Sequence, residues 1–561
     1  MIKKKIILFC LLLLFSATPV FARSNERLFV EPTHDIEKRK SVDAKLELVT
    51  NYIYFYFDQV WWETLDEEKK KEYKNVAYNL GNEFENKIYP EIKKDFGEVP
   101  KHNMVGYDDR ISVLFHPMEK GSGGYFRTGD QYSIYQYPQS NEKNIVYLNT
   151  DLIGNSGLPG YLAHEYIHLI TFNEKNKKHG IDEEVWLNEL RAEAIITILG
   201  YDKEYKGSNL QGRVKNFLRD PDISLTEWTE QIADYGVINI FAQYLLDHYG
   251  KEILIDSLKT NVVGIPSIDY ALLKGKHKKT FSEIFTDFKI AVYLNNCYYG
   301  EQYCFKNENL NNLNVYPTTV FITTRDEGFH EISYQTKNWA GNWFRFVGAS
   351  GTFNLNFSGG GKFVVPYILC KKNKECDIHF LETDEKNKGS IVVENFSSVY
   401  ESVTVIPSLQ QKFIGFDGAE RTQQFKLAIE IEEEIIAPDD ETTQKMQEKI
   451  ILLLEAIKKL YSLLGREIPE ITITRKIESD LYYGMIGSDE VKNLQYFLKN
   501  QGKEVYPEGL ITGNFYNLTK SAVIRFQEMH YEKILQPLGI LKGTGYVGEN
   551  TRKVINSFLT K

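Results

Sequence analysis

The sequence of 561 residues contains no long basic run. Its 67 basic and 77 acidic side chains give a formal net charge of −10, which argues against a nucleic-acid partner. Long apolar runs are also missing: after the N-terminal segment, no stretch reaches about 18 uninterrupted apolar residues, the length that spans a bilayer. The sequence therefore predicts no transmembrane segment once its N-terminal segment has been removed.

Residues 1–22 have the features of a secretory signal peptide. Three lysines, Lys3 to Lys5, precede the apolar run Ile6 to Phe15, and Val20 to Ala22 place small residues three and one positions before a cleavage site. The mature protein is thus expected outside the cytoplasm, either secreted or associated with the cell wall, in an extracellular or periplasmic compartment.

Cysteine is scarce, with five residues in the whole chain. Cys10 lies in the signal segment, and the other four form two close pairs, Cys297 with Cys304 and Cys370 with Cys376. An even number of closely spaced cysteines in an exported protein favours local disulfides. Four free, buried thiols would give the same pattern, because the sequence does not show whether the Cβ atoms meet.

The length predicts three or four folded units, and 42% hydrophobic residues supply enough apolar side chains for their cores. Composition and periodicity change along the chain, and the boundaries follow those changes. We expect a multidomain protein with an α+β domain at 43–305, a β-sandwich at 310–430, an acidic linker with a heptad-spaced helix at 431–477, and a small helical domain at 478–561. The heptad seam from Met446 to Leu464 fits either a coiled coil or one helix packed on a neighbouring domain.

The most informative motif is His164-Glu165-Tyr166-Ile167-His168, in a run from Leu158 to Phe172 that has no helix breaker after Gly160. A spacing of four places both imidazoles on one helical face, where two nitrogens can converge on one metal ion. Glu165 lies beside them and can deprotonate a metal-bound water without being a ligand.

A second helical stretch, Glu183 to Leu199, carries Glu189 and Glu193 one turn apart. Catalytic zinc needs three protein ligands and one open position, and Glu189 can supply the third ligand. Glu193 can accept the second ring proton of a ligand histidine and so hold its tautomer. A third histidine is not available, because Thr171 and Glu174 stand where an extended H-E-x-x-H motif has glycine and histidine.

Together, His164-Glu165-x-x-His168 and Asn188-Glu189-x-x-Ala192-Glu193 resemble the gluzincin group of zinc metallopeptidases. The Trp-Leu-Asn-Glu surroundings are more similar to hyicolysin-type bacterial peptidases than to thermolysin, in which Ser-Asp stands at Ala192-Glu193. The resemblance covers about Asp43 to Asn295. It implies a thermolysin-like fold, a bound Zn²⁺ ion and endopeptidase activity.

A donor that stabilises the oxyanion is expected opposite the metal, and Tyr235 and His248 are candidates, although a core or capping role suits each of them better. Gly121, Gly123 and Gly124 favour a flexible turn between two strands rather than a nucleotide site, because no helix-opening phosphate motif follows them.

The C-terminal segment, Glu478 to Lys561, resembles a small three-helix peptidoglycan-binding domain. The resemblance lies in Asp489 to Leu498, Gly509 to Phe515 and Gly545 to Gly548. Helical spacing of Val491, Leu494 and Phe526 supports the fold. Binding to peptidoglycan is what the resemblance implies, and a spacer or pro-domain role remains open.

The leading hypothesis is a secreted zinc endopeptidase that hydrolyses extracellular proteins or peptides and is tethered to the cell wall by its C-terminal domain. An enzyme that cuts peptidoglycan cross-links is the first alternative. A non-catalytic wall-binding protein with a structural metal site is the second.

Overall fold

The computed structural model describes residues 25–101, 110–322, 329–412, 421–432 and 476–559. The predicted signal peptide and the heptad-spaced segment lie outside these residues. Contacts divide the chain into two compact units. The first comprises Met1–Glu183, Ile195–Lys203 and Leu258–Val263, and the second comprises Glu184–Ala194, Glu204–Ser257 and Gly264–Lys561. Within the described part of the chain, no helix has the length and apolar character needed to cross a membrane.

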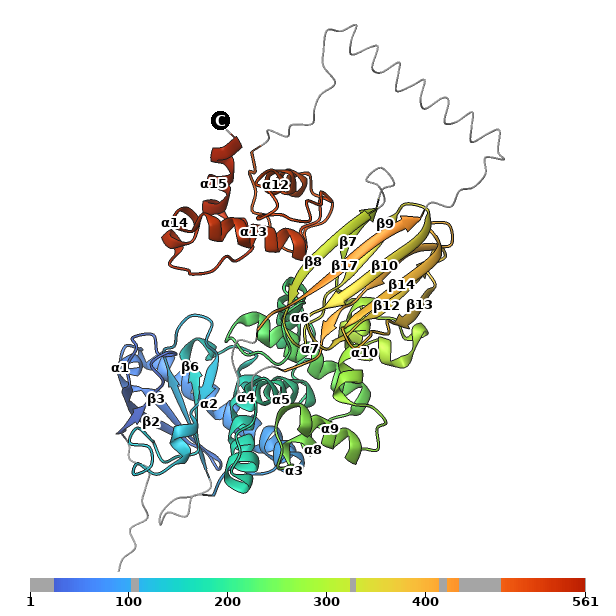
Figure 1. Cartoon of the computed structure of the whole chain (residues 1–561). Coiled ribbons are helices and arrows are strands. Elements are labelled where there is room, and N and C mark those ends of the chain that lie inside the picture. The colour runs from blue at the N-terminus through green and yellow to red at the C-terminus, as the bar shows by residue number, and fades with distance from the viewer. Residues whose placement is uncertain (1–24, 102–109, 323–328, 413–420, 433–475, 560–561) are drawn as a thin grey trace, which may run out of the picture. The chain divides into compact units, whose positions relative to one another are not determined.

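A six-stranded sheet forms the centre of the first unit (Figure 1), in the order β1-β2-β3-β4-β6-β5. Strands β3, β4 and β6 are parallel, and the other pairs are antiparallel. The strands are β1 (Asn25–Phe29), β2 (Ser41–Val49), β3 (Ile53–Asp58), β4 (Ile111–His116), β5 (Gly124–Phe126) and β6 (Ile145–Asn149). The α+β domain predicted to begin at residue 43 leaves out β1, although β1 pairs with β2.

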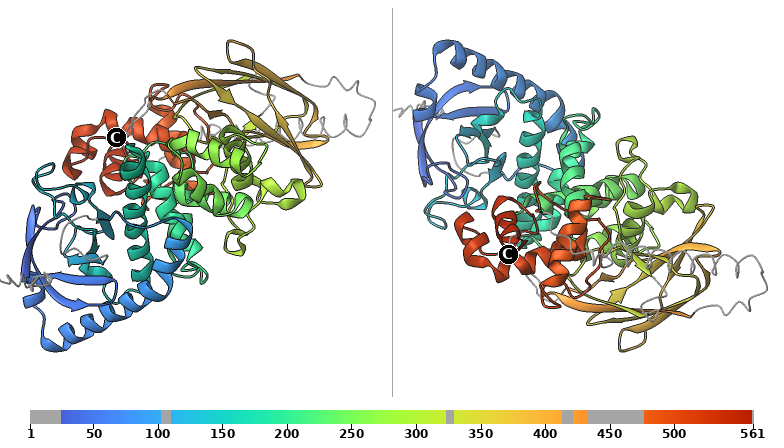
Figure 2. Two further views of the ribbon diagram at one scale, coloured as in Figure 1. Left: turned by 90° about the horizontal axis from the view of Figure 1, so that it is seen from below. Right: turned by 90° about the horizontal axis from the view of Figure 1, so that it is seen from above.

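Two interior strands, β4 and β6, are buried at every residue. Continuous apolar strands of this kind are typical of parallel strands that are covered on both faces. Helix α2 contacts β2 and α4, and Figure 2 shows it running along the sheet. The helical elements of this part of the chain are α1 (Gln59–Glu63), α2 (Glu67–Glu83), η1 (Phe84–Ile88), α3 (Tyr89–Asp95), α4 (Leu158–Thr171) and η4 (Phe172–Lys177).

The second unit begins with helices and continues into strands. Helix α10 starts at a capping box formed by Thr280 and Glu283, which satisfies backbone N–H groups at the helix start. The predicted local disulfides are confirmed: Cys297 bonds to Cys304 and Cys370 to Cys376. The helices are α5 (Val185–Ile198), α6 (Asn209–Arg219), α7 (Ile232–Tyr249), α8 (Glu252–Leu258), α9 (Gly264–Lys274) and α10 (Phe281–Leu294). The last four residues of α5 and the last residue of α8 fall in the first unit.

The strands predicted between 310 and 430 form a nine-stranded sheet and a separate two-stranded one. Alternate side chains along β10 and β17 are buried, as expected for strands with one covered face. The strands are β7 (Thr318–Ile322), β8 (Phe329–Thr336), β9 (Phe344–Gly348), β10 (Gly351–Gly359), β11 (Phe363–Val364), β12 (Pro366–Lys371), β13 (Cys376–Phe380), β14 (Lys388–Phe396), β15 (Tyr400–Val405), β16 (Ser408–Leu409) and β17 (Gln423–Glu432).

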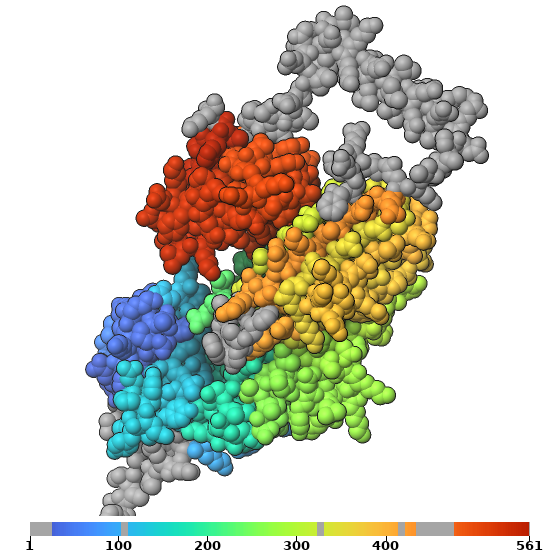
Figure 3. All heavy atoms as spheres, viewed as in Figure 1, coloured from blue at the N-terminus to red at the C-terminus, as the bar shows by residue number. Residues whose placement is uncertain are grey.

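The C-terminal module, residues 476–559, is helical and is drawn in red in Figure 3. Ser488 caps its first helix by accepting a hydrogen bond from the Val491 amide. The module contains α12 (Asp489–Asn500), α13 (Asn517–Met529), α14 (Tyr531–Ile534) and α15 (Glu549–Leu559).

Two halves of this module repeat one motif at an offset of 32 residues. The Gln495 side chain accepts from the amides of Thr512 and Gly513 and donates to the Thr519 hydroxyl. In the second half, Gln527 does the same with Thr544, Gly545 and Thr551. Gly513 and Gly545 both have positive φ, 75° and 73°, which glycine adopts without strain. The module is therefore an internal repeat in which one glutamine in each half holds a Thr-Gly turn.

Candidate metal centre

Helix α4 carries three of the predicted site residues, His164, Glu165 and His168. Pro159 lies in its first turn, where a missing N–H costs nothing, and nearly every residue of the helix is buried. A helix that is apolar on all sides belongs in a protein interior. The exposed fractions of His164, Glu165 and His168 are only 8%, 4% and 6%.

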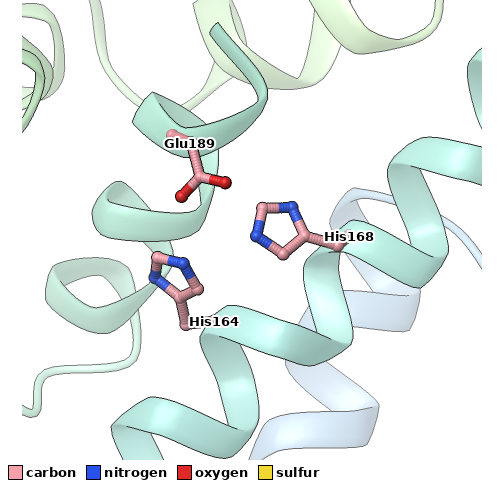
Figure 4. Close-up of side chains that lie close together, drawn as sticks. All are labelled: His164, His168 and Glu189. Atoms are coloured by element: carbon pink, nitrogen blue, oxygen red, sulfur yellow. The ribbon is translucent and has the colours of Figure 1, made fainter. Parts of the chain in front are cut away.

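The two imidazoles and one carboxylate lie close together. One ligand atom each from His164, His168 and Glu189 all fall within 4.8 Å of one another. Figure 4 shows the three side chains pointing toward one another, with both histidines on one helix and Glu189 on another. The imidazole rings are 5.1 Å apart and nearly perpendicular. Among the described residues, this is the one group of three or more histidine, cysteine or acidic side chains found with such spacing.

This donor set fits zinc. Zn²⁺ prefers nitrogen and oxygen ligands in tetrahedral geometry, with bonds of about 2.1 Å that place ligand atoms about 3.4 Å apart. Separations of at most 4.8 Å come within small side-chain rotations of that value. Two histidines and one glutamate also leave a fourth position for water or substrate, as catalytic zinc sites require.

Glu165 lies against the edge strand β5. A Cβ atom added at Gly124 would lie 3.0 Å from Glu165 Oε1 and 2.6 Å from the Tyr147 carbonyl oxygen. The Phe126 ring, at the other end of β5, lies 6.5 Å from the His168 ring at an angle of 23°. Strand β5 therefore passes directly beside Glu165, and a side chain at position 124 would force its neighbours to shift.

The glycines of this segment are thus not the simple turn that the sequence suggested. Gly124 begins β5, and a Cβ atom at Gly123 would meet the Tyr161 ring at 2.3 Å, so both serve close packing. Gly121 alone has the positive φ, 94°, of a turn glycine with open space around it. The sequence pattern could not separate these roles, because they depend on which helix packs against the strand.

A buried network holds the loop that follows β5. Asp130 accepts hydrogen bonds from the Tyr147 hydroxyl at 2.6 Å, from Arg127 Nη1 at 3.0 Å and from the Asn141 amide at 2.9 Å. Burial raises the pKa of Asp130 to about 6, while Arg127 opposes this effect. The network ties both ends of the β5–β6 loop to β6, and so fixes the strand that borders Glu165.

Glu193 is fully buried and strongly bound. Its carboxylate accepts from Asn209 Nδ2 at 2.8 Å, from Asn239 Nδ2 at 2.9 Å, and from Arg213 through Nε at 2.9 Å and Nη2 at 2.7 Å. Such charge-assisted, two-pronged binding fixes the orientation of a carboxylate. Sequence reasoning did not find Arg213 or Asn239, which come from α6 and α7. The predicted bond from Glu193 to a ligand histidine stays a prediction.

Tyr235 and His248, the two candidate oxyanion donors, have well-defined neighbours. The Arg213 guanidinium lies 4.6 Å above the Tyr235 ring, which also meets Trp228 edge-on. His248 Nε2 lies 2.9 Å from the Cys304 carbonyl oxygen, and burial lowers the pKa of His248. These contacts give His248 a structural role beside the Cys297–Cys304 disulfide, whereas Tyr235 touches the residue that holds Glu193.

Comparison with known proteins identifies two regions of similarity. Residues 487–555 match the family described as "Putative peptidoglycan binding domain". The chain is also 28% identical over 249 residues to the neutral metalloprotease ShpI of Staphylococcus hyicus, which covers 38% of this chain and 53% of that protein. The chain thus spans about half the length of this curated relative.

Two solved structures share a local likeness. They are the periplasmic inhibitors of g-type lysozyme, PliG, from Aeromonas hydrophila and Salmonella Typhimurium, at 12% and 11% identity and TM-scores of 0.15 and 0.14. They cover 20% and 21% of this chain and 96% and 100% of their own lengths. With TM-scores this low, neither informs the fold or function of the protein.

Proposed function

We propose that the protein is an exported zinc endopeptidase that hydrolyses proteins or peptides and is held at the cell wall by its C-terminal module. The observation that carries the proposal is the convergence of His164, His168 and Glu189, with Glu165 on the same helix. The similarity to a neutral metalloprotease and the match to a peptidoglycan-binding family support its two parts.

His164, His168 and Glu189 would hold the zinc ion, which supplies Lewis acidity and lowers the pKa of water when bound. Glu165 would take the proton from the attacking water and pass it to the amine of the leaving peptide. Its carboxylate is nearly buried, at 4% exposure, so little bulk water competes for that proton.

The edge strand β5 provides a binding site for the substrate. Among the strands that the structure describes, it pairs only with β6, so its outer backbone groups can pair with an extended peptide. Because Gly124 lies against Glu165, a peptide aligned on β5 would present a backbone carbonyl close to the general base. Backbone pairing of this kind selects extended chains with little preference for sequence.

The match of residues 487–555 to a peptidoglycan-binding family favours one second candidate. In that case the same site would cut the peptide cross-links of peptidoglycan, and the module would bring the enzyme to its substrate. The chemistry at Glu165 would be unchanged, and only the substrate class would differ.

A single digestion experiment separates these functions. The full-length protein is incubated with a denatured protein mixture and with purified sacculi, each with a chelator, without it, and with chelator followed by added zinc. We expect protein fragments in the first sample, loss of activity with chelator and its return with zinc. Release of muropeptides without protein cleavage would favour the cross-link hydrolase. Activity that the chelator does not reduce would contradict both functions.

A further inference from the structure

The 32-residue repeat shows which residues of the C-terminal module the fold itself requires. Glutamine, threonine and glycine recur in both halves and make the same hydrogen bonds. The residue after each glycine differs: Asn514 accepts from the Gly487 amide, whereas the equivalent Tyr546 is 44% exposed. Since the same turn forms with asparagine, the aromatic ring at position 546 is not needed to make it.

Tyr546 has a neighbour of the same kind. Tyr482 is 51% exposed, and the two rings are 6.3 Å apart and only 20° from parallel. Leu481 and Val547, the adjacent residues, are buried and exchange two backbone hydrogen bonds, Leu481 N to Val547 O at 3.2 Å and the reverse at 2.8 Å. This short bridge fixes the backbone beneath both tyrosines, so the exposed rings are held in place before any ligand binds.

Polar groups border one end of this tyrosine pair. The Tyr546 hydroxyl donates to the Asp480 carboxylate, which also forms an ion pair with Arg552. The Asp480 side chain is 43% exposed and can still accept from a ligand hydroxyl. Two flat apolar faces beside a fixed carboxylate suit a ligand that has both an apolar face and hydroxyl groups.

We propose that Tyr482 and Tyr546 form the sugar-binding site of the module and stack on pyranose rings of the peptidoglycan glycan strand, with Asp480 accepting from a ring hydroxyl. The inference rests on the proposed wall binding and names the residues and the part of the wall polymer. C–H groups on one face of a pyranose pack on the negative face of an aromatic ring, while its hydroxyls remain at the rim.

The charge of the module agrees with an uncharged ligand. Residues 476–559 contain ten lysines and arginines and nine acidic residues, so no excess charge attracts an anionic wall polymer. Phe558 is also 44% exposed, but its ring packs against Phe497, Phe526 and His530. Leu538 and Leu541, two further exposed apolar residues, are aliphatic and offer no flat face for stacking. They serve as controls rather than as an alternative site.

The test measures binding of the full-length protein to purified sacculi that have been stripped of teichoic acids, with chelator present to prevent digestion. The variants are Tyr482→Ala, Tyr546→Ala and the double substitution. Tyr482→Leu and Tyr546→Leu remove the flat ring but keep apolar bulk, in case alanine disturbs the bridge. Tyr546→Phe keeps the ring without the hydroxyl, and Leu541→Ala is the matched control. Peptide-free glycan strands and free stem peptides are added separately as competitors.

Each ring removed, by alanine or by leucine, should weaken binding about five- to tenfold, and the double substitution should weaken it about fiftyfold. Tyr546→Phe should stay within about threefold of the parent, since stacking is retained, and Leu541→Ala should bind like the parent. Glycan strands should compete, and stem peptides should not.

Variants without the rings that bind as tightly as the parent would overturn the inference, as would competition by stem peptides alone. If the unsubstituted protein does not sediment with sacculi, wall binding itself is wrong and this site is wrong with it. The two failures are therefore distinguishable by the parent protein alone.

Discussion

The candidate metal centre and the tyrosine pair of the C-terminal module present their side chains in opposite ways. His164, Glu165 and His168 are at most 8% exposed, whereas Tyr482 and Tyr546 are 51% and 44% exposed. A site that moves protons gains from excluding water, because electrostatic interactions are stronger there. A site that holds a cross-linked polymer must lie on the surface, because the polymer cannot enter a pocket.

This difference implies that the two sites work independently. The proposed metal ligands all precede Leu199, and the tyrosine pair lies after residue 476. Changes at one site should therefore alter one measured property and leave the other intact. An effect of a change at the metal centre on binding to sacculi, or of a change at the tyrosine pair on hydrolysis, would contradict this independence.

The largest effect is expected from Glu165→Gln. The amide cannot take a proton from water, so peptide hydrolysis should fall about a thousandfold, while zinc content stays at the level of the parent because the three ligands remain. Activity on a soluble peptide and metal analysis measure the two properties. Glu68→Gln, on the exposed face of α2, is the control. Loss of zinc along with activity would show that Glu165 is a ligand or a structural residue.

Glu189→Ala should have the next largest effect and a different signature. Because it removes one of three protein ligands, zinc affinity should fall about a hundredfold or more, and activity should fall with it at limiting zinc. Titration with a zinc chelator of known affinity measures the change. Full zinc content and full activity in this variant would contradict the proposed ligand set, whatever the behaviour of Glu165→Gln.

The candidate metal centre could be proposed from the sequence because its strongest signal is local. Two histidines at a spacing of four lie on one helical face in any α-helix, so α4 and its two proposed ligands could be named without the fold. The contacts of Gly124 with Glu165 and of Arg213 with Glu193 join residues that are distant in the sequence. They depend on strand order and helix packing, which no local pattern specifies.

Apolar runs in the sequence do not all correspond to single strands. Strands β4 and β6 each coincide with an apolar run of the sequence, but the apolar run from Phe363 to Leu369 is not one strand. It divides into β11 and β12, and β12 begins at Pro366, because proline cannot donate within a ladder and suits the first position of a strand. The 32-residue repeat, in contrast, was available in the sequence, since Gln495, Thr512 and Thr519 recur as Gln527, Thr544 and Thr551.

Removing the C-terminal module should separate the two properties directly. A chain that ends just after Glu432 should cleave a soluble peptide within about twofold of the parent, and should bind sacculi at least about tenfold more weakly. The cut must follow Glu432 because this residue completes β17, where it pairs with Thr352. Equal sedimentation of the shortened and full-length proteins would place wall binding elsewhere in the chain.

The isolated module provides the reciprocal measurement. It should begin at Lys476, because Ile477 is 1% exposed and exchanges two hydrogen bonds with Asn556, each 2.9 Å long. This piece should bind sacculi without cleaving peptide. If it remains in the supernatant at low salt although circular dichroism shows it to be helical, the module is better interpreted as a spacer.

The smallest effect is expected from Gly124→Ala, which tests how closely the proposed hydrolysis depends on strand β5. The added methyl group would lie 3.0 Å from Glu165 Oε1 and 2.6 Å from the Tyr147 carbonyl oxygen, and the carbonyl belongs to a buried strand that moves little. Glu165 should therefore be displaced by a few tenths of an ångström, and hydrolysis should slow about fivefold. Zinc content and binding to sacculi should not change. Gly212→Ala, on α6 with nothing within 4 Å of the new methyl group, is the matched control and should keep full activity. Full activity in Gly124→Ala would mean that β5 does not constrain Glu165. The extended peptide substrate would then have to bind at an element other than β5.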